Sequence, residues 1–265
     1  MMVPRHIPTA HWLSPPPAGL PAAGELHVWR AGLDWAPGAL AAAASSLSPD
    51  ERERAARLRL PAHRDAFVAA RAFLRGVLAR CLGADAAALR FGATAHGKPY
   101  LTAPATSLHF NLAHSGGVAL LAVTGDGPVG VDVERVRADL NLDGIARRFF
   151  RPEEAAALAA LSPARRTEAF FAVWTRKEAL LKALGKGIAG GVDRYGVTVA
   201  PEAPARVIAA AGGPGEAARW WVADLAAGSG YRAAVAAPAA PRRVLTWAWP
   251  DPVDSPASRA AEEIP

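Results

Sequence analysis

Two carboxylates alternate with valines in the segment VGVDVERV, where Asp132 and Glu134 are separated by one residue. If this segment is a strand, its valines face a core, and both acids face the opposite side about 6.6 Å apart. Two carboxylates on one face repel each other unless a positive group lies between them, and Mg²⁺ is a hard cation that takes oxygen ligands. The pattern therefore predicts a divalent metal site. An isolated acid pair is also typical of the solvated face of a hairpin, and that interpretation stays open.

Lysine is rare in this chain, and its placement is uneven. Only four of the 30 basic residues are lysine, and three of them, Lys177, Lys182 and Lys186, lie in the segment KEALLKALGKG. Lysine carries a compact charge on a flexible stem, which suits a phosphate that moves through a reaction in a narrow site. Gly185 and Gly187 would allow the backbone to approach a ligand closely. The clustering therefore indicates phosphate chemistry.

Glu178 lies in the same segment, at helical spacing from two other notable side chains. Trp174, Glu178 and Lys182 are spaced i, i+4 and i+8, so they share one face of a helix. Glu178 before Lys182 is also the favourable order for a plain surface ion pair, worth only about 0.2–0.5 kcal/mol. Phe170 and Phe171 indicate that part of this surface is covered, and an ordinary ion pair in this chain would be expected to use arginine. From the residues alone, a surface ion pair and a site for phosphate chemistry both stay open.

Arginines follow one side of a helical segment in the first half of the chain. Arg64, Arg71 and Arg75 are spaced by seven and four residues, so they form a stripe beside the apolar face of that helix. Any one of them is typical of a solvated surface. As a functional interpretation, Arg71 or Arg75 reaches toward an anion at the edge of a cleft.

Two short glycine-containing segments carry further polar groups. HGKPYL places Lys98 in a turn, and NLAHSGG places His114 and Ser115 at the end of a strand. A lone histidine is usually structural. A His–Ser–Gly–Gly turn is more suggestive of a phosphate contact in a chain that already carries a lysine cluster. No P-loop or nucleophile elbow is present.

These side chains need a mixed set of elements to position them. Proline in the first turn and glycine just past the end mark helices, and alternating apolar residues mark strands. Ser48 and Glu51 form a capping box at the start of one helix. The predicted helices span about 48–58, 63–82, 142–150, 152–161 and 163–184. The predicted strands are 25–31, SLHFNLAH, VALLAVT, VGVDVERV, 193–199, 218–224 and 231–236.

Composition bounds the class of protein. The chain has 265 residues, 51% of them hydrophobic, with a net charge of +6 and a pI of about 10.1, which favours anionic partners. Cys81 is the only cysteine, so the sequence offers no intrachain disulfide and no cysteine-based zinc site. The sequence shows no signal peptide and no apolar run of about 20 residues. We therefore expect a soluble, cytoplasmic protein with no membrane or nucleic-acid partner.

Four motifs in order resemble the 4′-phosphopantetheinyl transferases: GKPYL, FNLAHSGGVALLAV, VGVDVERV and FFAVWTRKEALLKALGKGI. The resemblance covers roughly 48–200 and is to the longer, monomeric type that activates peptide and polyketide synthases. It implies an α+β fold of two similar α/β halves related by a pseudo-twofold, with the active site at their interface. We expect a Pro-rich arm at 1–24, halves at 25–126 and 127–240, and a Pro/Ala-rich tail at 241–265.

The resemblance also implies an activity and its partners. Such an enzyme transfers the phosphopantetheine arm of coenzyme A to a serine of an apo acyl or peptidyl carrier protein, with Mg²⁺, and releases adenosine 3′,5′-bisphosphate. The implied Mg²⁺ ligands are Asp132, Glu134 and Glu178. The implied contacts with coenzyme A are Lys98, His114, Lys177 and Lys182, with Arg54 and Arg71 as looser matches. Lys186 and Ser115 join this set on the residue argument above.

Charge then suggests a mechanism. Three carboxylates and a diphosphate cannot share a site without a cation, and Mg²⁺ would take up charge as the P–O bond breaks. Glu178 is the candidate general base toward the carrier serine, and Lys182 would stabilise the leaving phosphate. One departure stands out: Glu51 and Arg54 occupy positions where relatives often have two basic residues.

Two other functions use the same residues. In a metal-dependent phosphohydrolase, the acids and lysines would activate water and release phosphate without an acceptor. A non-catalytic coenzyme A-binding module would bind without turnover and would be indifferent to Mg²⁺.

Overall fold

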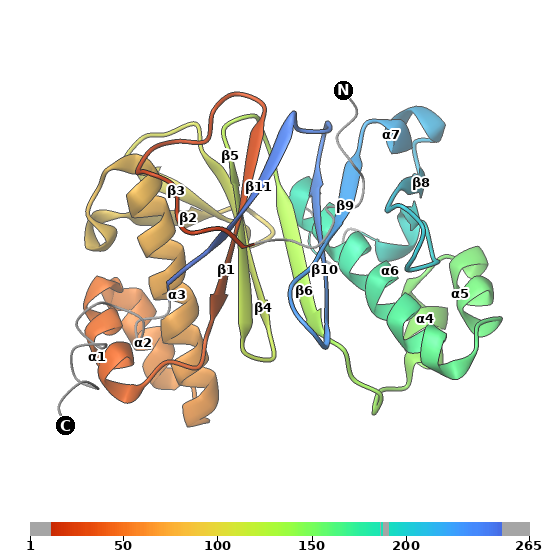
Figure 1. The fold of residues 1–265 in the computed structure, drawn as a ribbon, viewed down its shortest axis with the longest axis horizontal. Coiled ribbons are helices and arrows are strands. Elements are labelled where there is room, and N and C mark those ends of the chain that lie inside the picture. Colours follow the sequence, from red (N-terminus) through yellow and green to blue (C-terminus); the bar gives the residue numbers. More distant parts are fainter. Residues whose placement is uncertain (1–11, 186, 188–190, 251–265) are drawn as a thin grey trace.

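The computed structural model describes residues 12–185, 187 and 191–250. Two β-sheets stand side by side in the middle of the molecule, and helices cover the outer side of each sheet (Figure 1). The layers therefore run from helices through two sheets to helices again. Three hydrophobic clusters fill the spaces between successive layers.

The first half of the chain builds most of the four-stranded sheet, whose strand order is β11-β1-β5-β4. β4 and β5 form an antiparallel hairpin, and β5 pairs antiparallel with β1. The short strands β2 and β3 pair with each other beside this sheet. The elements in chain order are β1 (Glu25–Gly32), α1 (Pro37–Ala43), η1 (Ala44–Ser46), α2 (Pro49–Arg57), α3 (Pro61–Leu82), η2 (Ala86–Ala88), β2 (Arg90–Ala93), β3 (Pro99–Ala103), β4 (His109–Ser115) and β5 (Val118–Thr124).

The second half builds a three-stranded antiparallel sheet with the order β6-β10-β9. Helix α6 lies along this sheet and contacts all three strands. The elements in chain order are β6 (Gly130–Arg135), α4 (Leu142–Phe149), α5 (Pro152–Ala159), α6 (Pro163–Leu184), η4 (Val192–Arg194), β7 (Gly196–Val197), β8 (Val207–Ala209), α7 (Pro214–Ala218), β9 (Trp221–Leu225) and β10 (Tyr231–Ala237).

Each half contains one long helix that begins and ends in the same way. α3 and α6 are both 22 residues long and carry proline in the first turn. They end at Gly83 and Gly185, whose φ angles of 61° and 70° are the left-handed conformation that favours glycine. The expected α+β fold in two similar parts is confirmed by this arrangement.

Both ends of the described chain contact the first half. The expected tail contains β11 (Arg243–Ala248), which pairs in parallel with β1 and forms an edge of the four-stranded sheet. The expected arm also contacts the body, because Leu13 N–H donates to the Thr246 carbonyl at 3.0 Å. Beyond β11, Trp249 packs against Gly76 of α3, where a Cβ atom would lie 2.7 Å from the indole ring.

The cluster between the two sheets holds the halves together. It combines Leu120 and neighbouring residues of the first sheet with Val131 and Val133 of the second. A polar contact joins the facing strands, since the Val131 N–H donates to Asn111 Oδ1 at 2.8 Å. β6 therefore lies at the junction of the halves. Among the described residues, none of the helices has the length and apolar character that a bilayer crossing requires.

Candidate active site

Strand β6 separates its valines from its acids as the alternating sequence predicts. Val129, which precedes the strand, and Val131 and Val133 within it are at most 1% exposed, in the cluster between the sheets. Asp132 and Glu134 therefore point to the opposite side, where α6 crosses the strand. This face is covered by a helix, so Asp132 is only 4% exposed. A solvated hairpin face does not describe this arrangement.

Gly130 allows β6 and α6 to approach closely. A Cβ atom at this position would lie 2.0 Å from the Ala179 carbonyl oxygen and 2.4 Å from the Ala183 N. Both are backbone atoms of α6 and cannot swing aside as a flexible side chain would. Because glycine has no side chain, α6 can pack directly against the acidic face of β6.

Helix α6 presents two charged side chains to that face. Lys182 Nζ lies 2.6 Å from Asp132 Oδ1 and donates to the Val131 carbonyl at 3.3 Å. Glu178 precedes Lys182 by four residues, so both lie on the same side of the helix. Glu178 is 8% exposed, which is unusual for a carboxylate.

Burial raises the pKa values of the three acids, and repulsion by a neighbouring acid adds to the rise for Glu134 and Glu178. Burial raises the pKa of Glu178 to about 7, Lys182 opposes that rise, and Asp132 and Glu134 add to it. Burial also raises the pKa of Asp132 and of Glu134, again against the effect of Lys182. The three acids and Lys182 therefore form one electrostatic cluster that draws residues from β6 and α6.

The cluster has oxygen atoms that suit a hard cation. Asp132 Oδ2 and Glu178 Oε1 are buried and accept no hydrogen bond from the protein. Buried carboxylate oxygens without partners are costly, and a divalent cation such as Mg²⁺ would satisfy them. Within the described residues, however, no three His, Cys, Asp or Glu side chains stand at the spacing of a complete metal site. The donor chemistry fits Mg²⁺, while these side-chain positions leave the ligand set open.

Ser115 and His114 approach the cluster from the end of β4. Ser115 Oγ donates to Glu134 Oε2 at 2.8 Å and accepts from the Arg135 N–H at 3.2 Å. Burial lowers the pKa of His114, and the nearby Lys182 ammonium lowers it further. The first half of the molecule thus adds two side chains to a site based on the second half.

Lys98 joins the two halves next to this cluster. It follows the turn between β2 and β3, and its Nζ donates to the Lys182 carbonyl at 2.6 Å and the Val129 carbonyl at 2.9 Å. The first of these acceptors belongs to the last turn of α6, where a cation is favoured by the helix dipole. In this structure Lys98 acts as a tie between the halves beside the expected ligand site.

A cleft of about 510 Å³ opens beside His114 in the first half. Its wall combines apolar and aromatic side chains with several arginines, which suits a ligand that carries both a ring and negative charge. The Arg54 guanidinium lies 5.4 Å from the Phe67 ring centre, and that of Arg71 lies 4.9 Å from the Phe91 ring centre. The lining residues that bear on the argument are Glu51, Arg54, Phe67, Arg71, Phe91 and His114.

Lys177 lies elsewhere, and we do not retain it among the ligand contacts. It is 1% exposed, its Nζ lies 2.7 Å from Glu154 Oε2, and it donates to the Val192 carbonyl at 3.0 Å. Its ammonium is thus turned into the interior of the second half. The physical reason is helical: Lys177 is five residues from Lys182, which places the two on different sides of α6. Lys186 lies outside the described residues.

The sequence did not predict the partners of two buried acids in this region. Glu51 binds two arginines in addition to capping α2, and Glu154 is the buried partner of Lys177. Gly130 was available as a signal, because glycine inside an apolar strand often marks a close approach of another backbone. The partners of Glu51 and Glu154 are 20 or more residues away, so local spacing gave no signal for them.

Known proteins match most of the described chain. The 4′-phosphopantetheinyl transferase superfamily matches residues 128–236, and the N-terminal family of 4′-phosphopantetheinyl transferases matches residues 34–125. The 4′-phosphopantetheinyl transferase HetI of a Nostoc species is 38% identical over 198 residues, covering 74% of this chain and 83% of HetI. The 4′-phosphopantetheinyl transferase Sfp of Bacillus subtilis is 32% identical over 155 residues, covering 58% of this chain and 66% of Sfp.

Proposed function

Because the chain belongs to the 4′-phosphopantetheinyl transferase superfamily and is an enzyme of that class, we propose a specific reaction for it. It transfers the 4′-phosphopantetheine arm of coenzyme A to a serine of an apo carrier protein, depends on Mg²⁺, and releases adenosine 3′,5′-bisphosphate. The observation that carries the proposal is the buried cluster of Asp132, Glu134, Glu178 and Lys182 beside a cleft rich in arginine.

Glu178 is suited to accept the proton of the carrier serine. Burial beside Asp132 and Glu134 raises the pKa of Glu178 to about 7 when no cation is bound, so this carboxylate has a stronger tendency to take up a proton than an exposed one. The serine oxygen forms a bond to the phosphorus of the phosphopantetheine arm, and the diphosphate P–O bond breaks. The hydroxyl proton goes to Glu178, and negative charge develops on the leaving adenosine bisphosphate.

The other members of the cluster would balance the negative charge of the diphosphate, directly or through Mg²⁺. Lys182 donates from a partly buried ammonium and would stabilise the phosphate that leaves. Asp132, Glu134 and Glu178 would hold Mg²⁺, which would supply positive charge against the diphosphate. Ser115 fixes the carboxylate of Glu134 through its hydroxyl, so that this acid keeps its orientation.

The cleft in the first half would take the nucleotide end of coenzyme A. Phe67 and Phe91 offer ring faces, and Arg54 and Arg71 lie over them with positive charge. His114 lines the cleft and is close enough to Lys182 for that ammonium to lower its pKa, so it would lie near both the nucleotide end and the reacting diphosphate. Lys98, whose ammonium donates to the Lys182 carbonyl at the end of α6, would contribute positive charge near both the nucleotide end and the diphosphate.

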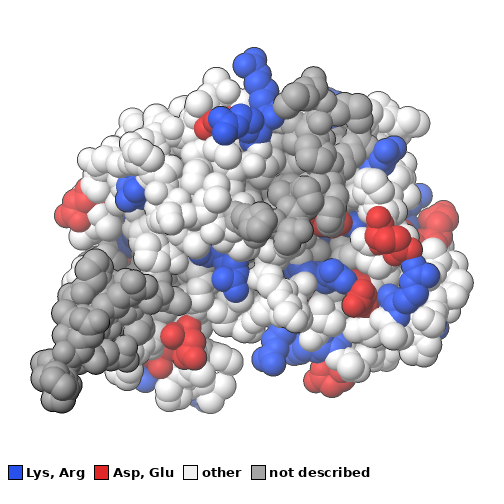
Figure 2. All heavy atoms as spheres, in the orientation of Figure 1, with Lys and Arg blue, Asp and Glu red and all other residues white. Residues whose placement is uncertain are grey.

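The acceptor would be an acidic carrier protein. The enzyme has a net charge of +6, and such a charge speeds encounter with an acidic partner. Figure 2 shows basic side chains across the centre and lower right of the visible face, mixed with acidic ones. A monomeric state and a cytoplasmic location stay predictions.

Intact-mass measurement of a carrier protein tests the proposal. The enzyme is incubated with coenzyme A, Mg²⁺ and an apo carrier, and the expected result is a gain of one phosphopantetheine unit on the carrier. Omitting Mg²⁺ is the matched control and should abolish the gain. Phosphate release without a carrier would instead favour a phosphohydrolase. Binding of coenzyme A without any turnover, and with no effect of Mg²⁺, would favour a non-catalytic binding module.

A further inference from the structure

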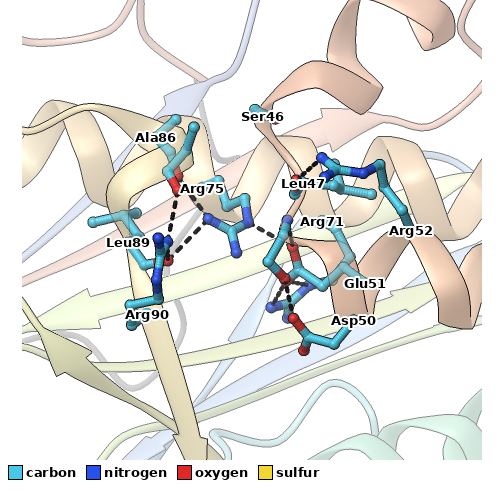
Figure 3. A network of polar contacts seen from close by, with 12 residues as sticks. Ser46, Leu47, Asp50, Glu51, Arg52, Arg71, Arg75, Ala86, Leu89 and Arg90 are labelled. Carbon is cyan, nitrogen blue, oxygen red and sulfur yellow. Dashed lines mark hydrogen bonds and ion pairs between the residues drawn. The ribbon is translucent and has the colours of Figure 1, made fainter.

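Glu51 lies between two arginines on the wall of the cleft (Figure 3). Its Oε1 accepts from Arg71 Nε at 2.6 Å and from Arg71 Nη2, and its Oε2 accepts from Arg75 Nε at 2.7 Å. The Glu51 side chain is 7% exposed. A carboxylate therefore already occupies the donor edge of Arg71 in a cleft that suits an anionic ligand.

Glu51 is ionised in this setting. Burial alone would raise its pKa, but Arg71, the Ser48 N–H and Arg75 together hold that pKa below its ordinary value. Arginine binds carboxylate and phosphate with the same planar fork of N–H donors. Glu51 therefore takes up Arg71 Nε and Nη2, two donors that a ligand phosphate would otherwise use.

The second arginine is also committed to the protein. Arg75 Nη1 donates to the Ala86 carbonyl at 2.7 Å and to the Leu89 carbonyl at 3.2 Å, and the side chain is 1% exposed. Glu51, Arg71 and Arg75 together carry one net positive charge instead of two. This part of the wall thus offers an incoming phosphate fewer free donors and a weaker field than the number of arginines suggests.

We propose that Glu51 is a specificity-determining residue: it acts as an internal counter-anion that makes the enzyme weakly dependent on the 3′-phosphate of coenzyme A. The inference rests on the proposed function, in which the cleft takes the nucleotide end of the ligand. The enzyme then uses coenzyme A lacking its 3′-phosphate nearly as well as coenzyme A itself. Removing the charge of Glu51 frees Arg71 for the phosphate and restores the distinction.

A purely structural role for Glu51 makes a different prediction. Glu51 also caps α2, because its carboxylate accepts from the Ser48 N–H at 2.9 Å, and its ion pairs with Arg71 and Arg75 join α2 to α3. If that is its whole role, Glu51→Gln lowers the free energy of unfolding and leaves the preference between the two ligands unchanged. The ratio of the two ligands, rather than activity alone, separates the two roles.

The experiment compares coenzyme A with 3′-dephospho-coenzyme A for the wild-type enzyme, Glu51→Gln and Glu53→Gln. Dissociation constants are measured by calorimetry, and kcat/KM is measured by mass gain of the carrier. Glu53 is the matched control, because it lies on the same helix and pairs with Arg57 in an exposed ion pair. We expect a wild-type preference for coenzyme A of less than about tenfold, and a further rise of about fivefold or more in Glu51→Gln alone.

Two results would overturn the inference. One is a wild-type preference for coenzyme A above about 100-fold, which needs no variant and so decides the matter even if Glu51→Gln fails to fold. The other is a folded Glu51→Gln enzyme whose ratio equals that of the wild type. If coenzyme A itself neither binds nor modifies a carrier, the proposed function fails as well, so the two failures are distinguishable.

Discussion

Glu178 combines three properties that seldom occur together in a carboxylate: it is buried, one of its oxygens lacks a hydrogen bond, and its pKa is raised to about 7. Each follows from its position on α6 opposite Asp132 and Glu134. A structural carboxylate is normally satisfied by donors, as Glu51 is by its arginines. The unsatisfied state of Glu178 is what would be expected of a group that binds a cation or takes a proton.

Replacing Glu178 by glutamine tests this assignment. The amide keeps the size of the side chain but removes its charge and its capacity to accept a proton, so we expect transfer to fall by about 10²-fold or more. Binding of coenzyme A, measured by calorimetry, should stay largely intact because the nucleotide cleft is untouched. Glu168→Gln is the control on the same helix, where the exposed Glu168 pairs with Arg232. Near-normal turnover of Glu178→Gln would rule out the general-base role.

Local spacing predicted the cluster residues that lie near each other in sequence or share a regular period. The alternation of valines and acids placed Asp132 and Glu134 on one face, and the i, i+4 rule did the same for Glu178 and Lys182. The same rule should have separated Lys177 from Lys182, because a step of five residues turns a helix through about 500°. The motif resemblance had grouped Lys177 with Lys182. In the structure Lys177 instead forms a buried ion pair with Glu154.

At the scale of elements, the contact of β6 with α6 decides whether the cluster forms. Gly130→Ala would place a methyl group 2.0 Å from the Ala179 carbonyl oxygen, so α6 must move away from β6. Overpacking of this kind costs about 1–3 kcal/mol, and the shift would separate Lys182 from Asp132. We expect a lower melting temperature and a large loss of transfer. Gly125→Ala, where a Cβ atom meets nothing within 4 Å, should change neither quantity.

Lys177 and Glu154 connect α6 to α5 inside the second half. Glu154 Oε1 also accepts from the Val197 N–H at 2.7 Å, so the pair reaches β7 as well. Lys177→Met would leave the carboxylate buried without its cation, which costs about 3–5 kcal/mol in comparable buried pairs. Denaturant unfolding should show this loss, whereas Arg57→Met in an exposed pair should cost about 1 kcal/mol or less. Equal losses for the two variants would contradict a buried structural role for Lys177.

Long, regular elements were predictable, and short or irregular ones were not. The end signals of α3 and α6 are proline and glycine at fixed positions, so their bounds followed closely from the sequence. β2 and β3 are four and five residues long and contain glycine and proline, which argue against strands when read locally. The cleft depends on those short strands, since Phe91 lies on β2. The sequence therefore predicted the acid–lysine cluster better than the cleft beside it.

At the scale of the whole molecule, the two halves share one core. Both sheets press an apolar face into the cluster between them, and β4 lies against β6. The site uses that junction, because Ser115 and Lys98 come from the first half while the acids come from the second. Neither half could present this set of side chains alone. The placement of the site thus follows from the packing of two amphipathic sheets rather than from either sheet by itself.

The last described segment, β11 and Trp249, packs against the first half, and truncation tests how much it contributes to stability. After β10, the chain crosses back to the first half, where β11 pairs with β1 and Trp249 fits against Gly76. Removing residues 242–265 would expose the backbone edge of β1 and the apolar surface under Trp247 and Trp249, so we expect a marked fall in melting temperature. Removing only 251–265 keeps β11 and Trp249 and is the matched control. If both truncations melt at the wild-type temperature, the pairing of β11 with β1 contributes nothing measurable to stability.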